Sequence, residues 1–270
     1  MAVPPSNAPP PGFRQRFRVM RSERDNPWWS IVFGGPLGAL LAAAVGEVRW
    51  ITPNMLTVLA FTCRMTAAVG IVLGARGAAG CHDLLAVVCM QLAEVLDCAD
   101  GRLARYRRMP SAFGAFLDKV TDVVGLLAIL GAFAWRVHAD TGDELAMLLC
   151  AGAVMLWSAR MYAFWVVVSL ERDAGVPDPA TSDGPRTRGE LSLGGRMLYA
   201  LRSTYWIFYF GEADAYFWLS LALLTGWLAP IAYLYGIGLG GWSIVVILYW
   251  MLYARRLDGF TRDRVPRQSQ

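Results

Sequence analysis

Lysine, histidine and paired cysteines are nearly missing from this 270-residue sequence. Lys119 is the only lysine, and His82 and His138 are the two histidines. The five cysteines form no Cys-x-x-Cys pair and no Cys/His cluster, which argues against a zinc site and favours inert buried thiols. No basic stripe alternates with exposed aromatic residues, so we expect no nucleic-acid partner.

Long apolar runs are present instead. Hydrophobic residues make up 56% of the chain, and several runs approach the ~20 apolar residues that a helix needs to cross a bilayer. The sequence therefore predicts an all-α, polytopic membrane protein whose membrane domain covers residues 28–255. We expect six transmembrane helices, over residues 54–73, 82–101, 112–135, 144–170, 213–235 and 242–253.

The two ends of the chain differ from this membrane domain. Residues 1–27 are rich in proline and arginine, and we expect a disordered basic tail. Residues 28–45 begin with Trp28 and Trp29, which predicts an amphipathic helix lying in the membrane interface. Residues 256–270 are expected to form a basic cytoplasmic tail.

Arginine placement predicts the orientation. Most arginines fall in the N-terminal tail, in the segments 102–108 and 172–202, and in the C-terminal tail. The other connections, near Gly77, His138 and Gly238, hold few. Cytoplasmic segments of membrane proteins carry the excess of positive charge. We therefore expect a multi-pass protein of the cell membrane with both termini on the cytoplasmic side.

Five small or acidic residues mark the junction between the second and third predicted spans. Asp97 and Asp100 are three residues apart, so they share a helix face, and Gly114, Asp118 and Asp122 follow one another at intervals of four. A short arginine-rich loop makes the two helices antiparallel neighbours. Four carboxylates are therefore expected to converge at the cytoplasmic end of this helix pair.

Such a cluster requires compensation, because carboxylates at membrane depth are costly and repel one another. All-oxygen ligands favour Mg²⁺ or Mn²⁺, and two such ions would clamp a diphosphate. Arg105 can bind a phosphate oxygen. The small residues Gly101, Ala104 and Gly114 would let a nucleotide approach the helix backbones.

The complete pattern, D-x-x-D-G-x-x-A-R-x8-G-x-x-x-D-x-x-x-D, resembles the signature of the CDP-alcohol phosphotransferase family, also called CDP-alcohol phosphatidyltransferases. Every fixed position is present between Asp97 and Asp122. The six spans, the N-terminal helix and the Thr52-Pro53-Asn54-x-x-Thr57 entry to the first span are also similar to that family. The resemblance covers roughly residues 28–255.

The resemblance implies a membrane enzyme of phospholipid synthesis that acts as a homodimer. It implies two Mg²⁺ or Mn²⁺ ions held by Asp97, Asp100, Asp118 and Asp122, with Asp122 as the general base. The acceptor hydroxyl would lose its proton to Asp122 and attack the β-phosphorus of a CDP-linked donor, releasing CMP. We expect CDP-diacylglycerol as the donor and a polar alcohol as the acceptor.

Several residues outside the aspartate motif are weaker candidates. Asn54 and Thr57 either hold the CDP phosphates or cap and pack their helix. Glu94 either supports the site or pairs with Arg105. Three arginines are candidates for acceptor binding, with ion pairing or headgroup binding as the alternatives: Arg160, Arg196 and Arg202.

Lys119 is expected to point to a different face from its neighbour Asp118. His82 and His138 are expected on the opposite side of the membrane from the aspartates.

Two alternative functions stay open from the sequence. The same chemistry can use CDP-choline, CDP-ethanolamine or a CDP-polyol as the donor, with a lipid or polyol as the acceptor. A cation-coupled transporter is the more distant alternative, and it is disfavoured because no internal repeat is visible and the carboxylates cluster at one end.

Overall fold

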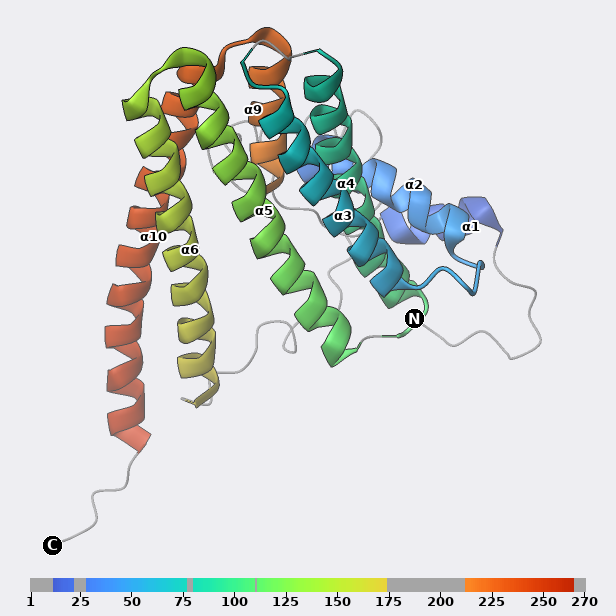
Figure 1. Ribbon diagram of the computed structural model, residues 1–270. Coiled ribbons are helices and arrows are strands. Elements are labelled where there is room, and N and C mark those ends of the chain that lie inside the picture. The colour runs from blue at the N-terminus through green and yellow to red at the C-terminus, as the bar shows by residue number, and fades with distance from the viewer. Residues whose placement is uncertain (1–11, 22–27, 77–79, 110, 174–211, 265–270) are drawn as a thin grey trace, which may run out of the picture.

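In the computed structural model the structure describes residues 12–21, 28–76, 80–109, 111–173 and 212–264, which are helical apart from the short connections between helices (Figure 1). The N-terminal part holds α1 (Phe13–Arg21), the π-helical segment η1 (Ser30–Gly34) and α2 (Gly35–Val45). The bundle is formed by α3 (Pro53–Leu73), α4 (Cys81–Tyr106), α5 (Ala112–Thr141), α6 (Glu144–Asp173), α9 (Glu212–Thr225) and α10 (Leu228–Arg264).

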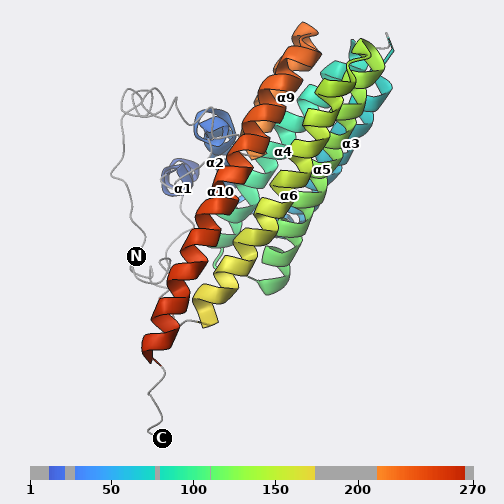
Figure 2. The same cartoon turned by 90° about the vertical axis from the view of Figure 1, so that its left-hand side faces the viewer.

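The bundle helices fall into two groups. Helix α3 packs against both α4 and α5, while α6 packs against α10 and against α5. Helix α9 lies against α4 and α10. Helices α1 and α2 run side by side and crosswise to the bundle, as the two views in Figures 1 and 2 show together, and α2 packs on α4.

Local sequence signals fix the helix ends around the predicted site. Thr52 caps α3, because its hydroxyl accepts the backbone N–H of Met55 at 3.3 Å and Pro53 follows as the first helical residue. Ser111 caps α5 in the same way through the N–H of Gly114 at 2.9 Å. Helix α5 ends at Gly142, whose φ of 67° is readily adopted by glycine.

Small residues let these helices approach closely. Ala67 and Ala86 are fully buried, and Gly70 stands where a Cβ would come within 3.1 Å of the His82 carbonyl oxygen. Gly38 likewise lets α2 approach α4, since a Cβ there would lie 2.6 Å from the Cβ of Cys98. The packing brings α2 and α3 close to α4 near its acidic segment.

The predicted spans are confirmed in part. Within the part of the chain that the structure describes, four helices are long and apolar enough to cross a membrane, namely α3, α5, α6 and residues Leu228–Arg255 of α10. Helix α4 has 26 residues but carries several acidic residues, and α9 has only 14 residues. The count of six spans therefore stays a prediction.

The predicted boundary between the fifth and sixth spans is wrong. The break lies at Gly226 and Trp227, not between residues 235 and 242. Thr225 accepts the N–H of Trp227 at 3.3 Å, and Gly226 has a φ of 75°. The glycines near Gly238, expected in a loop, lie inside α10, because glycine is tolerated where membrane helices pack closely.

The expectation of a disordered tail is wrong for residues 13–21, which form α1. Phe17 and the fully buried Met20 pack with the cluster around α2, so apolar contacts order this basic segment. The helix expected over residues 28–45 is present as the helical turn at Trp28 and Trp29 followed by η1 and α2. Its amphipathic, interfacial character stays a prediction.

Candidate active site

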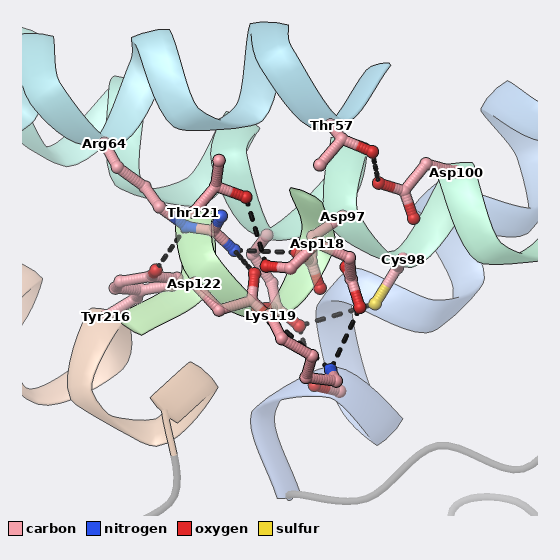
Figure 3. A network of polar contacts seen from close by, with 12 residues as sticks. Thr57, Arg64, Asp97, Cys98, Asp100, Asp118, Lys119, Thr121, Asp122 and Tyr216 are labelled. Atoms are coloured by element: carbon pink, nitrogen blue, oxygen red, sulfur yellow. Dashed lines mark hydrogen bonds and ion pairs between the residues drawn. The ribbon is translucent and has the colours of Figure 1, made fainter. Parts of the chain in front are cut away.

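Three of the four predicted aspartates meet at one point. Asp97 comes from α4, and Asp118 and Asp122 come from successive turns of α5 (Figure 3). One carboxylate oxygen from each lies within 4.8 Å of the others. The short connection between α4 and α5 produces this arrangement, because it sets the two helices antiparallel with their acidic faces together.

The chemistry of these side chains fits a divalent cation. All three ligands are carboxylates, which hard ions such as Mg²⁺ and Mn²⁺ prefer. The side chains of Asp97 and Asp118 are each 30% exposed and that of Asp122 is 13% exposed, so the cluster is sheltered but open to one side. Repulsion among three carboxylates at such distances favours binding a cation.

Among the described residues, Arg64 and Lys119 contact this cluster with their basic side chains. Arg64 of α3 is 1% exposed and lies 2.7 Å from Asp97 and 3.1 Å from Asp122. The half-exposed Lys119 lies 3.0 Å from Asp118 and 3.5 Å from Asp122. The expectation that Lys119 points away from the aspartates is therefore wrong, because its long side chain reaches across from the neighbouring position on α5.

Sequence reasoning missed Arg64. The signal was available, because a charged residue inside an apolar run of membrane-span length is usually functional.

Asp100 lies outside the three-aspartate group. It is buried, and its Oδ2 accepts a 2.5 Å hydrogen bond from the hydroxyl of Thr57 on α3 (Figure 3). Thr57, expected at the CDP phosphates, is thus placed against Asp100. Asp100 as a metal ligand and Thr57 as a phosphate ligand stay predictions.

The small motif residues lie where helices or side chains come close. A Cβ at Gly114 would sit 2.8 Å from the Ser111 hydroxyl and 3.0 Å from Oδ1 of Asn54, so the first turns of α3 and α5 are in contact. A Cβ at Gly101 would lie 3.2 Å from the guanidinium of Arg105, which is itself exposed. Ala104 is partly buried on the same stretch of α4.

The connection before α3 is held by an arginine beyond the motif. Arg107 donates from its guanidinium to four backbone carbonyls at the end of α2 and after it, those of Val45, Gly46, Val48 and Ile51, at 2.5–3.0 Å. These bonds tie the C-terminal end of α4 to the segment that leads into Asn54 and Thr57. Arg107 therefore fixes one border of the site.

Glu94 and the acceptor candidates lie in different places. Glu94 is 4% exposed and accepts hydrogen bonds from the Ser30 hydroxyl at 2.6 Å and the Cys98 thiol at 3.4 Å, so it holds η1 against α4. Arg160 is 8% exposed in the middle of α6. Arg196 and Arg202 lie outside the described residues.

A family model for CDP-alcohol phosphatidyltransferase matches residues 50–224. The chain belongs to the CDP-alcohol phosphatidyltransferase family. No match to a curated protein was found. The match begins just before α3 and includes the whole aspartate motif.

Family membership gives the general activity, and the apolar helices agree with the location in a membrane. CDP-alcohol phosphatidyltransferases transfer substituted phosphate groups and generally depend on divalent metal ions, and this member carries a cluster of three aspartates that could hold such an ion. Its long apolar helices agree with a membrane protein.

Proposed function

We propose that this enzyme moves a phosphatidyl group from CDP-diacylglycerol to an alcohol, with release of CMP, as a step of phospholipid synthesis. The observation that carries the proposal is the convergence of Asp97, Asp118 and Asp122 within 4.8 Å, inside the family match. Two Mg²⁺ or Mn²⁺ ions would be held by these residues together with Asp100. Divalent ions bound there would neutralise charge on the diphosphate of the donor.

The residues of the chain supply binding, orientation and proton transfer. Asp122 accepts the proton of the acceptor hydroxyl, whose oxygen then forms a bond to the β-phosphorus. The bond between that phosphorus and the oxygen bridging the two phosphates breaks, and the electron pair leaves with CMP. Asp122 suits this role because it is the most sheltered carboxylate of the cluster, with a side chain that is still 13% exposed.

The donor is expected to bind along α4 and the first turns of α3 and α5. Arg105 is exposed there and can hold a phosphate oxygen through its planar guanidinium. Residues without bulk lie beside it, and two polar side chains border the same region. The proposed CDP-binding set is Gly101, Ala104, Arg105, Gly114, Asn54 and Thr57.

Three arginines are proposed for the acceptor: Arg160, Arg196 and Arg202. A buried arginine such as Arg160 in an apolar helix is suited to an anionic group, for example a phosphorylated alcohol. If the acceptor is a phosphorylated alcohol, loss of the Arg160 charge should weaken acceptor binding selectively.

The proposed setting is a multi-pass protein of the cell membrane that works as a homodimer, with its termini and active site on the cytoplasmic side. The concentration of arginine at the ends of α4, α6 and α10 supports this orientation. Family resemblance supports the homodimer.

The experiment is CMP release by purified enzyme in detergent micelles with Mg²⁺ or Mn²⁺. CDP-diacylglycerol, CDP-choline, CDP-ethanolamine and a CDP-polyol are each offered with a panel of alcohols. We expect CMP with CDP-diacylglycerol. Release with only a CDP-linked polar alcohol would reverse the donor and acceptor, and no release above an Asp122→Asn control with any donor would contradict the proposed function.

A further inference from the structure

A fully buried arginine lies at the back of the aspartate cluster, outside the motif that runs from Asp97 to Asp122. Arg64 stands in the middle of α3, a helix otherwise apolar enough to cross a membrane, and is 1% exposed. Burying a guanidinium is costly unless it is paired and hydrogen-bonded. The guanidinium of Arg64 therefore needs partners that offset its charge.

The contacts of Arg64 connect four helices. Its Nη2 lies 2.7 Å from Oδ1 of Asp97 on α4 and 3.1 Å from Oδ1 of Asp122 on α5. Its Nε donates to the hydroxyl of Tyr216 on α9 at 2.9 Å, and Figure 3 shows Tyr216 on the far side of the guanidinium from the aspartates. Tyr216 is fully buried. Tyr216 thus fixes the Nε side of the guanidinium, while its Nη2 contacts Asp97 and Asp122.

Helix α5 is shaped to admit this side chain. At Gly125, one turn after Asp122, an added Cβ would approach the Cβ and Cγ of Arg64 to 3.1 and 3.2 Å and its Cδ more closely still. These atoms belong to the stem of a fully buried side chain, which has little room to move. Glycine at this position therefore permits the path of Arg64 toward Asp97 and Asp122.

Arg64 and Lys119 approach the aspartates by different oxygens. Arg64 contacts Oδ1 of Asp122, whereas Lys119 lies 3.5 Å from Oδ2 of the same carboxylate and 3.0 Å from Oδ2 of Asp118. The Arg64 contact is enclosed, and the Lys119 side is half exposed. A divalent ion entering from outside therefore meets the carboxylates on the Lys119 side, with Arg64 behind them.

We propose that Arg64 is a positioning residue. It holds Asp97 and Asp122 in one orientation and keeps the like-charged carboxylates together before a divalent ion binds, and Tyr216 holds Arg64. The inference rests on the proposed function for its catalytic consequence. An ion pair that only stabilises the fold is the competing explanation, and the two differ in how metal binding and turnover respond.

The test uses the full-length enzyme in detergent micelles and two readouts. The first is Tm in EDTA and in saturating Mn²⁺, and the second is kcat and KM for CDP-diacylglycerol. Three variants are compared: Arg64→Met, which removes the charge at similar length, Arg64→Lys, which keeps the charge but not the planar fork, and Tyr216→Phe, which removes one hydroxyl. Arg49→Met, at an exposed arginine before α3, is the control for loss of one positive charge.

For Arg64→Met we expect a lower Tm in EDTA and a roughly twofold larger rise with Mn²⁺ than in the wild type, because the ion then supplies the missing countercharge. We expect Arg64→Lys to recover Tm in EDTA while kcat stays reduced on the order of 10²-fold, since the two carboxylates are no longer oriented together. Donor KM stays unchanged, because the buried Arg64 does not contact the donor.

Tyr216→Phe keeps the proposal testable if Arg64→Met does not fold. We expect about a fivefold loss of kcat at unchanged donor KM, which corresponds to one lost hydrogen bond. The proposal is overturned by a wild-type Mn²⁺ response in Arg64→Met, by full kcat in Arg64→Lys, or by wild-type kcat in Tyr216→Phe. If the wild type releases no CMP from any donor, the proposed function fails, whereas the Mn²⁺ response still decides whether Arg64 organises the cluster.

Discussion

Two clusters of charged side chains lie at opposite ends of α4 and α5, and they differ in how far their charged groups are exposed. One joins Arg136 of α5 to Asp83 of α4 and to Asp140. The other is the aspartate cluster with Arg64 and Lys119. Asp83 and Asp97 are fourteen positions apart on α4, which is about 21 Å along a helix.

The Arg136 cluster is enclosed at Arg136 and Asp83, whereas Asp140 lies at its rim with a side chain that is 18% exposed. Arg136 is 3% exposed and Asp83 is 5% exposed, and the guanidinium also donates to the backbone carbonyl of Ile71 on α3 at 3.1 Å. Oδ1 of Asp140 accepts the backbone N–H of Arg76 at 2.6 Å. Together these bonds join the ends of α3, α4 and α5, so this cluster stabilises the bundle.

The aspartate cluster is built from the same kinds of residue but stays open. Three carboxylates face two basic side chains, of which Lys119 is half exposed, and the carboxylates of Asp97 and Asp118 are each 30% exposed. Its accessible carboxylates fit a bound cation and a substrate. Among the described residues each cluster has one carboxylate more than it has basic side chains, so access to the charged groups, and not buried charge alone, distinguishes the candidate active site.

The largest effect is expected at the aspartate end. Asp122→Asn keeps the size of the side chain but removes the proton acceptor, so CMP release should fall by about 10²- to 10⁴-fold. Tm should change little by comparison. The measurement is initial rate at saturating Mn²⁺, and substantial release by this variant would remove Asp122 from the role of general base.

Breaking the Arg136 cluster should affect stability instead. Arg136→Met leaves two carboxylates without their shared cation, one of them buried, and should destabilise the fold by about 3–5 kcal/mol. Thermal unfolding in detergent measures this loss. The CMP release of whatever protein remains folded should stay near the wild-type rate, and a selective loss of turnover at unchanged Tm would contradict the structural role.

A smaller loss of stability is expected from Gly74→Ala. An added Cβ would come within van der Waals radii of both the Asp83 carboxylate and the Arg136 guanidinium. The crowding should cost about 1–3 kcal/mol. Gly131→Ala is the matched control, because nothing lies within 4 Å of a Cβ there. Equal Tm values for the two variants would show that the Asp83 and Arg136 side chains move aside at little cost.

The smallest effect concerns Lys119. Lys119→Met removes a half-exposed cation from beside Asp118 and Asp122, and Mn²⁺ affinity should rise by about fivefold or less, as partly exposed ion pairs are weak. Titration followed by the electron paramagnetic resonance of free Mn²⁺ measures the change. Weaker Mn²⁺ binding would mean that Lys119 organises the site and does not compete with the ion.

The aspartate motif was the part of the site that sequence could predict. Spacings of three and four residues fix which side chains share a helix face, so the meeting of Asp97, Asp118 and Asp122 followed from two helices and a short loop. The contacts of Arg64 and Tyr216 could not be predicted in this way. They depend on how α3 and α9 pack against α5, which spacing within one helix does not specify.

The fold, like the site, could be predicted only where the pattern within one helix decides the structure. Apolar runs located most helices, whereas the end of α9 at Gly226 was missed because the glycines after Tyr235 were read as a turn. In the structure Gly236 packs against α6, where a Cβ would lie 3.1 Å from Leu149. Glycine serves equally in turns and in close helix contacts, and only the neighbouring helix distinguishes the two uses.

The most direct test of the account compares two aspartates on one helix that both contact a buried arginine. Asp122→Asn and Asp140→Asn are assayed for Mn²⁺-dependent CMP release from CDP-diacylglycerol, normalised to folded protein. We predict that Asp122→Asn loses release while Asp140→Asn retains it and shows only a lower Tm. Equal loss of release in the two folded variants, or retained release in Asp122→Asn, would contradict the assignment of chemistry to the open cluster.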